Sequence, residues 1–124
     1  MTPGRMTRKH TPAACPFCEA EVARPAAMDS EQGPDSPRGA RCACGALYLM
    51  DATGKQGGQV LLAGLAMLCD GDVDRAMSLR TGIDYELTPM SYNPRTHSLD
   101  RAERGRRFGV PKLWFFRRLP ASPP

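Results

Sequence analysis

The sequence has no apolar run long enough to cross a membrane. Its longest apolar stretch, Val60–Cys69, spans ten residues and contains one glycine, whereas a membrane-spanning helix needs ~20. No apolar run follows the basic residues near the N-terminus, so no secretory signal is indicated. We therefore expect a cytoplasmic protein with no membrane partner. In that compartment, closely paired cysteines are metal ligands or redox groups more often than structural disulfides.

Histidine is scarce as well, because the chain contains only His10 and His97. A cysteine nucleophile needs a neighbouring base, and the unpaired cysteine, Cys69, has neither histidine near it in the sequence. We predict that Cys69 is a small apolar residue of the core. The sequence shows no positive sign of an enzyme or of a small-molecule substrate.

Proline and glycine, by contrast, are plentiful, with 12 of each in 124 residues. Proline is about double its usual share of ~5%. The prolines gather before residue 45 and at the C-terminus, so a small, loop-rich domain that needs a staple is expected. The predicted division is a disordered basic tail (1–13), a metal-binding segment (14–51) with a flexible insert (25–40), a small α+β domain (52–119) and a disordered tail (120–124).

The hydropathy pattern predicts an α+β fold. Ala46–Asp51 is typical of a strand, and Gln59–Arg80 is expected to form a helical hairpin whose second helix begins after an N-cap at Asp72. A C-terminal β-hairpin is expected from Asp84–Tyr92, broken at Pro89, and Val110–Leu119. The last segment contains four contiguous apolar residues from Leu113 to Phe116, so it should be central in a sheet or covered on both sides.

Two cysteine pairs carry the strongest chemical signal. Cys15-Pro16-Phe17-Cys18 is followed, 23 residues later, by Cys42-Ala43-Cys44-Gly45. Zinc prefers four soft ligands at tetrahedral corners, and two tight turns can each supply two thiolates. Gly45 stands where a positive φ would relieve the second turn. The predicted Zn²⁺ ligands are Cys15, Cys18, Cys42 and Cys44; iron, a redox C-x-x-C, or His10 as a replacement ligand stay open as alternatives.

The two cysteine turns followed by a strand resemble a zinc ribbon. The resemblance covers residues 15–51, under half of the chain, and implies that the four cysteines hold a structural metal ion. The second pair departs from the usual pattern because one residue, not two, separates its cysteines. If all four positions are cysteine, the metal keeps no open position for water, which disfavours catalysis.

Basic residues gather in the C-terminal segment. Residues 95–124 contain eight Lys or Arg and two acidic residues, with aromatic residues between them. Arginine for phosphates and aromatic rings for bases are what single-stranded nucleic acid binding requires. The leading prediction is therefore a non-catalytic, zinc-stabilised module that binds nucleic acid; the alternative is an accessory subunit that docks on a larger protein assembly. The predicted partner-binding residues are Arg101, Arg104, Arg106, Arg107, Lys112, Arg117 and Arg118.

Two further motifs do not match a known site. The run Asp70–Asp74 begins like a calcium loop, but Arg75 and Thr81 occupy the positions where an EF-hand needs Gly and Glu. The glycine-rich run Gly54–Gly58 lacks the residue order of a phosphate-binding loop. We expect a plain strand-to-helix turn there, with weak anion binding at the helix N-terminus as the alternative.

Overall fold

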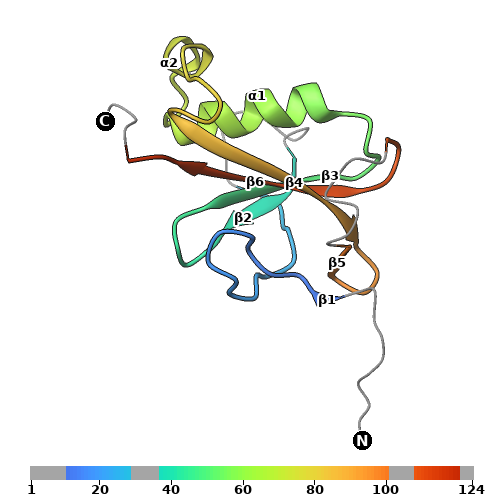
Figure 1. Cartoon of the computed structure of the whole chain (residues 1–124). Helices are drawn as coiled ribbons and strands as arrows, with labels where there is room; N and C mark the ends of the chain where they lie inside the picture. The colour runs from blue at the N-terminus through green and yellow to red at the C-terminus, as the bar shows by residue number, and fades with distance from the viewer. Residues whose placement is uncertain (1–10, 29–36, 101–107, 121–124) are drawn as a thin grey trace, which may run out of the picture.

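The chain folds around one antiparallel sheet. The computed structural model describes residues 11–28, 37–100 and 108–120. Within them the sheet has the strand order β1-β5-β4-β6-β3-β2, and every neighbouring pair is antiparallel (Figure 1). The strands are β1 (Thr11–Pro12), β2 (Gly39–Arg41), β3 (Leu47–Asp51), β4 (Tyr85–Asn93), β5 (Ser98–Asp100) and β6 (Lys112–Arg118).

Strand β6 lies inside the sheet, between β4 and β3. Because side chains alternate along a strand, Leu113 and Phe115 join the core on one face of the sheet, while Trp114 and Phe116 pack on the other. The prediction that this apolar run is covered on both sides is confirmed. Each face of the sheet therefore has its own apolar core.

Helix α1 (Gly57–Leu68) covers the face on which Trp114 and Phe116 pack. Its close approach to β6 depends on Gly64, where an added Cβ would meet the Phe116 ring at 2.3 to 2.6 Å. Cys69, at the end of the helix, is 4% exposed and belongs to this core, as expected. Neither helix in the described part of the chain has the length and apolarity needed to span a bilayer.

The other face is covered by the N-terminal segment that carries Cys15 and Cys18 (Figure 1). Val22 and the completely buried Tyr48 share this core, and the Tyr48 ring stacks on Phe115 with centroids 5.3 Å apart. The Tyr48 hydroxyl donates to the Ala23 carbonyl at 2.7 Å. Tyr48 therefore ties the N-terminal segment to β3.

The predicted α+β fold with a helical hairpin is wrong, because the sheet dominates and the second helix is only one turn. Helix α2 comprises five residues, Val73–Met77, although its N-cap is as expected: the Asp72 carboxylate accepts from the Arg75 backbone N–H. The helix ends at Ser78, whose hydroxyl and N–H both donate to the Arg75 carbonyl, at 2.7 and 3.0 Å. A serine that bonds the preceding turn competes with continued helix.

The predicted C-terminal hairpin and its break at Pro89 are also wrong. Strands β4 and β6 do pair, from Tyr85↔Arg118 to Ser91↔Lys112, but β5 intervenes in the sequence and pairs with the other edge of β4. Strand β4 runs through Pro89 without a break. Pairing with β5 reaches only Ser91, so within the described residues Pro89 has a neighbouring strand on one side, where a missing N–H is tolerated.

The predicted division into tails, metal-binding segment and α+β domain stays a prediction, since residues 1–10, 29–36 and 121–124 lie outside the described part. Strand β3, from the predicted metal-binding segment (14–51), pairs directly with β6, from the predicted α+β domain (52–119). An isolated antiparallel bridge joins Ala14 to Glu21, on either side of the first cysteine pair.

Candidate metal centre

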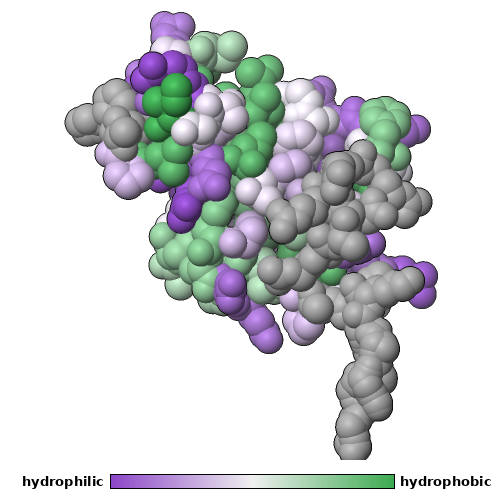
Figure 2. Space-filling model, viewed as in Figure 1, coloured by the Kyte–Doolittle hydropathy of each residue, from purple (hydrophilic) through white to green (hydrophobic). Residues whose placement is uncertain are grey.

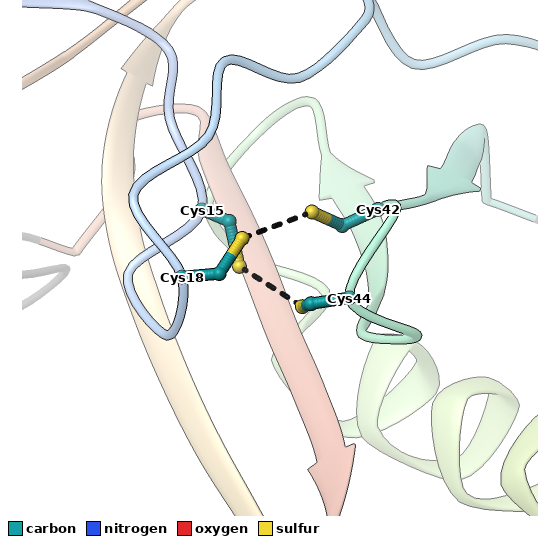
Figure 3. Close-up of side chains that lie close together, drawn as sticks. All are labelled: Cys15, Cys18, Cys42 and Cys44. Atoms are coloured by element: carbon teal, nitrogen blue, oxygen red, sulfur yellow. Dashed lines mark hydrogen bonds between the residues drawn. The ribbon is translucent and has the colours of Figure 1, made fainter.

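The four predicted ligands converge, although 23 residues separate the two pairs. The sulfur atoms of Cys15, Cys18, Cys42 and Cys44 all lie within 4.8 Å of one another. The Cys18 and Cys42 sulfurs are 3.5 Å apart, and those of Cys15 and Cys44 are 3.8 Å apart (Figure 3). A tetrahedral shell with metal–sulfur distances of ~2.3 Å would place its sulfurs ~3.8 Å apart. The cluster therefore fits a metal ion.

The first cysteine turn, Cys15–Cys18, is closed by backbone hydrogen bonds. The Cys15 N–H donates to the Ala20 carbonyl at 2.9 Å, and the Glu19 N–H donates to the Cys15 carbonyl at 2.8 Å. The Phe17 N–H points at the Cys15 sulfur, 3.4 Å away. Such an N–H group stabilises a thiolate and orients it toward a metal.

The second cysteine turn, Cys42–Gly45, connects β2 to β3. The Cys42 N–H donates to the Ala46 carbonyl and the Gly45 N–H donates to the Cys42 carbonyl, at 2.7 and 2.9 Å. Gly45 has a φ of 97°, so the predicted need for a residue that tolerates positive φ is confirmed. This geometry brings Cys42 and Cys44 to the same side of the hairpin as the first turn.

Burial divides the cluster into two buried and two exposed thiols. Cys15 and Cys42 are 1% and 8% exposed, whereas Cys18 and Cys44 are exposed to solvent. Burial raises the pKa of Cys15 to about 12 and also raises the pKa of Cys42. The backbone N–H of Ala20 lowers the pKa of Cys18. Metal binding would replace the buried protons by a cation, because zinc ligates the thiolate form.

Of the two histidines, His97 lies in the described part of the chain and His10 does not. Both ring nitrogens of His97 are engaged: Nε2 lies 2.6 Å from the Val22 carbonyl oxygen, and Nδ1 lies 2.7 Å from the Tyr92 hydroxyl. His97 thus has a structural role between the N-terminal segment and β4. His10, the alternative ligand, lies outside the described residues.

The predicted basic residues do not all lie in one place. Arg101, Arg104, Arg106 and Arg107 lie outside the described residues. Lys112 is 5% exposed, and its ammonium group contacts the Val110 carbonyl at 3.4 Å. Arg117 pairs with Glu86 across the strands, with N–O distances of 2.8 and 2.9 Å, and Arg118 donates to the Leu68 carbonyl at 3.2 Å. Lys112 and Arg118 therefore stand at opposite ends of β6, with the lysine in the interior.

A basic groove of about 780 Å³ adjoins the cysteine cluster. Cys44 and Gly45 form part of its wall, together with Arg117, Arg118 and the exposed Arg41. Arg41 is not among the predicted binding residues. The sequence feature that would have indicated it is its position directly before Cys42. The groove brings three guanidinium groups beside the candidate metal centre, with Asp70 as the acidic residue of its lining.

An apolar groove of about 750 Å³ lies along the two helices. Leu62, Val73 and Met77 contribute to its wall and are 53%, 60% and 62% exposed. Figure 2 shows apolar patches at the surface in the part of the view that α1 and α2 occupy. Large apolar side chains that gather at a surface are typical of contact sites for other molecules.

The glycine-rich turn before α1 binds the carboxylate of Asp51, the last residue of β3. Asp51 is 1% exposed, and its carboxylate accepts from the backbone N–H groups of Gly54 and Gln56 at 3.0 and 3.1 Å. Gln56 is the N-cap of α1, so the Asp51 carboxylate already places a negative charge beside this helix N-terminus, where a bound anion would be repelled. The geometry favours the plain strand-to-helix turn.

Comparison with known proteins adds no relative. No protein-family model, no curated protein and no solved structure matches the chain. The resemblance of residues 15–51 to a zinc ribbon therefore stands on the cysteine cluster, and the function rests on the chain's own geometry.

Proposed function

We propose that the chain is a non-catalytic, zinc-stabilised binding module. The observation that supports it is the convergence of four cysteine sulfurs, from two separate turns, within 4.8 Å. Four thiolates suit Zn²⁺ and fill its tetrahedral shell, which leaves no position for a reacting water. The ion would join the N-terminal segment to the β2–β3 hairpin, so its binding energy would stabilise the fold.

Metal analysis of the purified full-length chain tests the zinc site. The expected result is about one zinc per chain, together with a lower melting temperature after complete chelation. Less than one zinc per two chains, with no iron, would contradict any metal site. Iron in place of zinc would keep the site and change its metal.

The partner that we propose is nucleic acid. Support comes from the arginine-rich C-terminal segment and from the basic groove, where Arg41, Arg117 and Arg118 adjoin the cysteine cluster. Guanidinium groups bind phosphates through paired N–H donors. The predicted partner-binding residues also include the four arginines at positions 101, 104, 106 and 107.

Salt titration of binding to single-stranded RNA and DNA tests this partner. Removal of one side chain that binds a phosphate reduces the steepness of the log–log salt dependence by about 1. Arg41→Ala should weaken binding and flatten the slope, whereas Arg38→Ala, an exposed arginine that lines the apolar groove, is the matched control. Absence of binding at low salt would end the nucleic-acid proposal.

The apolar groove favours a second candidate function, docking on a larger protein assembly. Association through an apolar surface does not weaken with salt in the way that phosphate contacts do. Met77→Glu places a charge in the groove wall at a residue that is 62% exposed, so the fold should tolerate it. A protein that co-purifies with the wild-type chain at high salt and is absent with Met77→Glu would support docking; equal recovery with both would contradict it.

A further inference from the structure

We propose that the cysteine cluster is a peroxide-reactive site that releases its metal and closes two disulfides between the cysteine turns, Cys18–Cys42 and Cys15–Cys44. This inference rests on the proposed zinc site and adds a covalent modification to it. It also names which sulfurs would join.

The contacts between the sulfurs suggest the pairing. Cys18 lies 3.5 Å from Cys42, and Cys15 lies 3.8 Å from Cys44. Both contacts join the first turn to the second, over 24 and 29 residues of chain. In Figure 3 the two contacts run side by side between the turns. Two disulfides could therefore form by short movements of the side chains.

Exposure provides each pair with a sulfur that an oxidant can reach. Cys18 and Cys44 are exposed, while their partners Cys42 and Cys15 are 8% and 1% exposed. A dissolved peroxide would meet the exposed sulfur first, while the buried sulfur of the same pair stays shielded. Each pair thus contains one peroxidatic and one resolving cysteine, an arrangement that favours disulfides over further oxidation.

The chemistry balances with hydrogen peroxide as the oxidant. The exposed thiol takes one oxygen and becomes a sulfenic acid as the O–O bond breaks and water leaves. The buried thiol then attacks this sulfur, the S–S bond forms, and a second water leaves. For the zinc-loaded cluster, four thiolates, two peroxides and four protons yield two disulfides, four waters and a free Zn²⁺, because disulfide sulfur is a poor zinc ligand.

Peptide mapping of the full-length chain tests the pairing. Trypsin places Cys15 and Cys18 on one peptide, residues 10–38, and Cys42 and Cys44 on another, residues 42–55. Zinc-loaded protein is treated with two equivalents of hydrogen peroxide, free thiols are blocked, and zinc release is followed with a chromophoric chelator. We expect one zinc released per two peroxides and the two peptides joined, with fragmentation showing Cys18–Cys42 and Cys15–Cys44.

Several results would overturn the inference. Separate peptides with internal Cys15–Cys18 or Cys42–Cys44 bonds, sulfinic acids in place of disulfides, or zinc retained in excess peroxide would each do so. Cys69, which is 4% exposed, should stay reduced, and Cys69→Ala should release zinc at the wild-type rate. A chain that takes up no zinc would refute the proposed zinc site, while mapping of the reduced, metal-free chain would still decide the pairing.

Discussion

The guanidinium carbon of Arg117 lies 4.5 Å from the centroid of the Phe17 ring. Phe17 belongs to the first cysteine turn and Arg117 to β6, so this cation–π contact joins the turn to the sheet. Glu86, the cross-strand neighbour of Arg117, also holds the guanidinium through its carboxylate. The contact therefore supports the candidate metal centre, although neither Phe17 nor Arg117 is a candidate ligand.

Replacement of Arg117 by alanine should speed zinc loss. A cation–π contact at an exposed site contributes about 0.5–1 kcal/mol, so we expect zinc dissociation to a chelator to be about two- to fivefold faster. Arg38→Ala, which removes an exposed arginine that lines the other groove, should leave the rate unchanged. Equal rates for Arg117→Ala and the wild type would show that the contact does not stabilise the turn.

His97 joins the N-terminal segment to β4. Because a carbonyl oxygen only accepts, Nε2 donates to Val22, and in the neutral ring Nδ1 accepts from the Tyr92 hydroxyl. His97→Ala removes both bonds and should lower the free energy of unfolding by about 1–3 kcal/mol. Tyr92→Phe removes one bond and should cost less. Urea denaturation of the two variants measures the difference, and His97→Ala with wild-type stability would contradict the structural role.

Gly64 and Gly58 offer a matched pair of substitutions in α1. At Gly64 a Cβ would meet the Phe116 ring at 2.3 to 2.6 Å, whereas at Gly58 nothing lies within 4 Å. We expect Gly64→Ala to lower the free energy of unfolding by about 1–3 kcal/mol through overpacking. Gly58→Ala should leave stability unchanged or raise it by up to about 1 kcal/mol. Thermal melts of both variants test this order, and a stabilising Gly64→Ala would contradict the close packing of α1 on β6.

Removal of the metal should loosen one face of the sheet more than the other. The cysteine turns share their core with Val22 and Tyr48, while α1 packs on the opposite face with Leu47 and Phe116. After chelation we expect faster hydrogen exchange in residues 13–24 and little change in residues 60–68. Equal acceleration in both segments would mean that the metal stabilises the sheet as a whole.

Zinc binding should release protons at neutral pH. Burial holds the thiols of Cys15 and Cys42 protonated in the metal-free fold, since their pKa values are raised from 9.0, that of Cys15 to about 12. A thiolate must replace each thiol on binding. We therefore expect at least two protons released per zinc near pH 7.5, and an apparent affinity that rises as the pH rises. An indicator dye in weak buffer counts the protons, and release of fewer than two would contradict ligation by both buried cysteines.

Short-range chemistry explains what could be predicted before the fold was known. The spacing of the cysteines indicated two turns, Gly45 indicated a positive φ, and Asp72 indicated a helix start, because each depends on residues that are neighbours in the chain. The apolar run from Leu113 to Phe116 indicated a strand covered on both sides, since alternating side chains must all be buried. Each of these features is present.

The features that could not be predicted depend on contacts between distant parts of the chain. Periodicity suggested a longer second helix, but Ser78 ends it after one turn and the sheet takes most of the remaining chain. Lys112 resembled a surface cation in the sequence, yet its place on an inner strand buries it. The spacing of the cysteines identifies the candidate ligands, whereas the pairing of β3 with β6 and the covering N-terminal segment bring their sulfurs together. Chain neighbours set the local turns through backbone geometry, while strand order, burial and the meeting of the two cysteine turns follow from long-range packing.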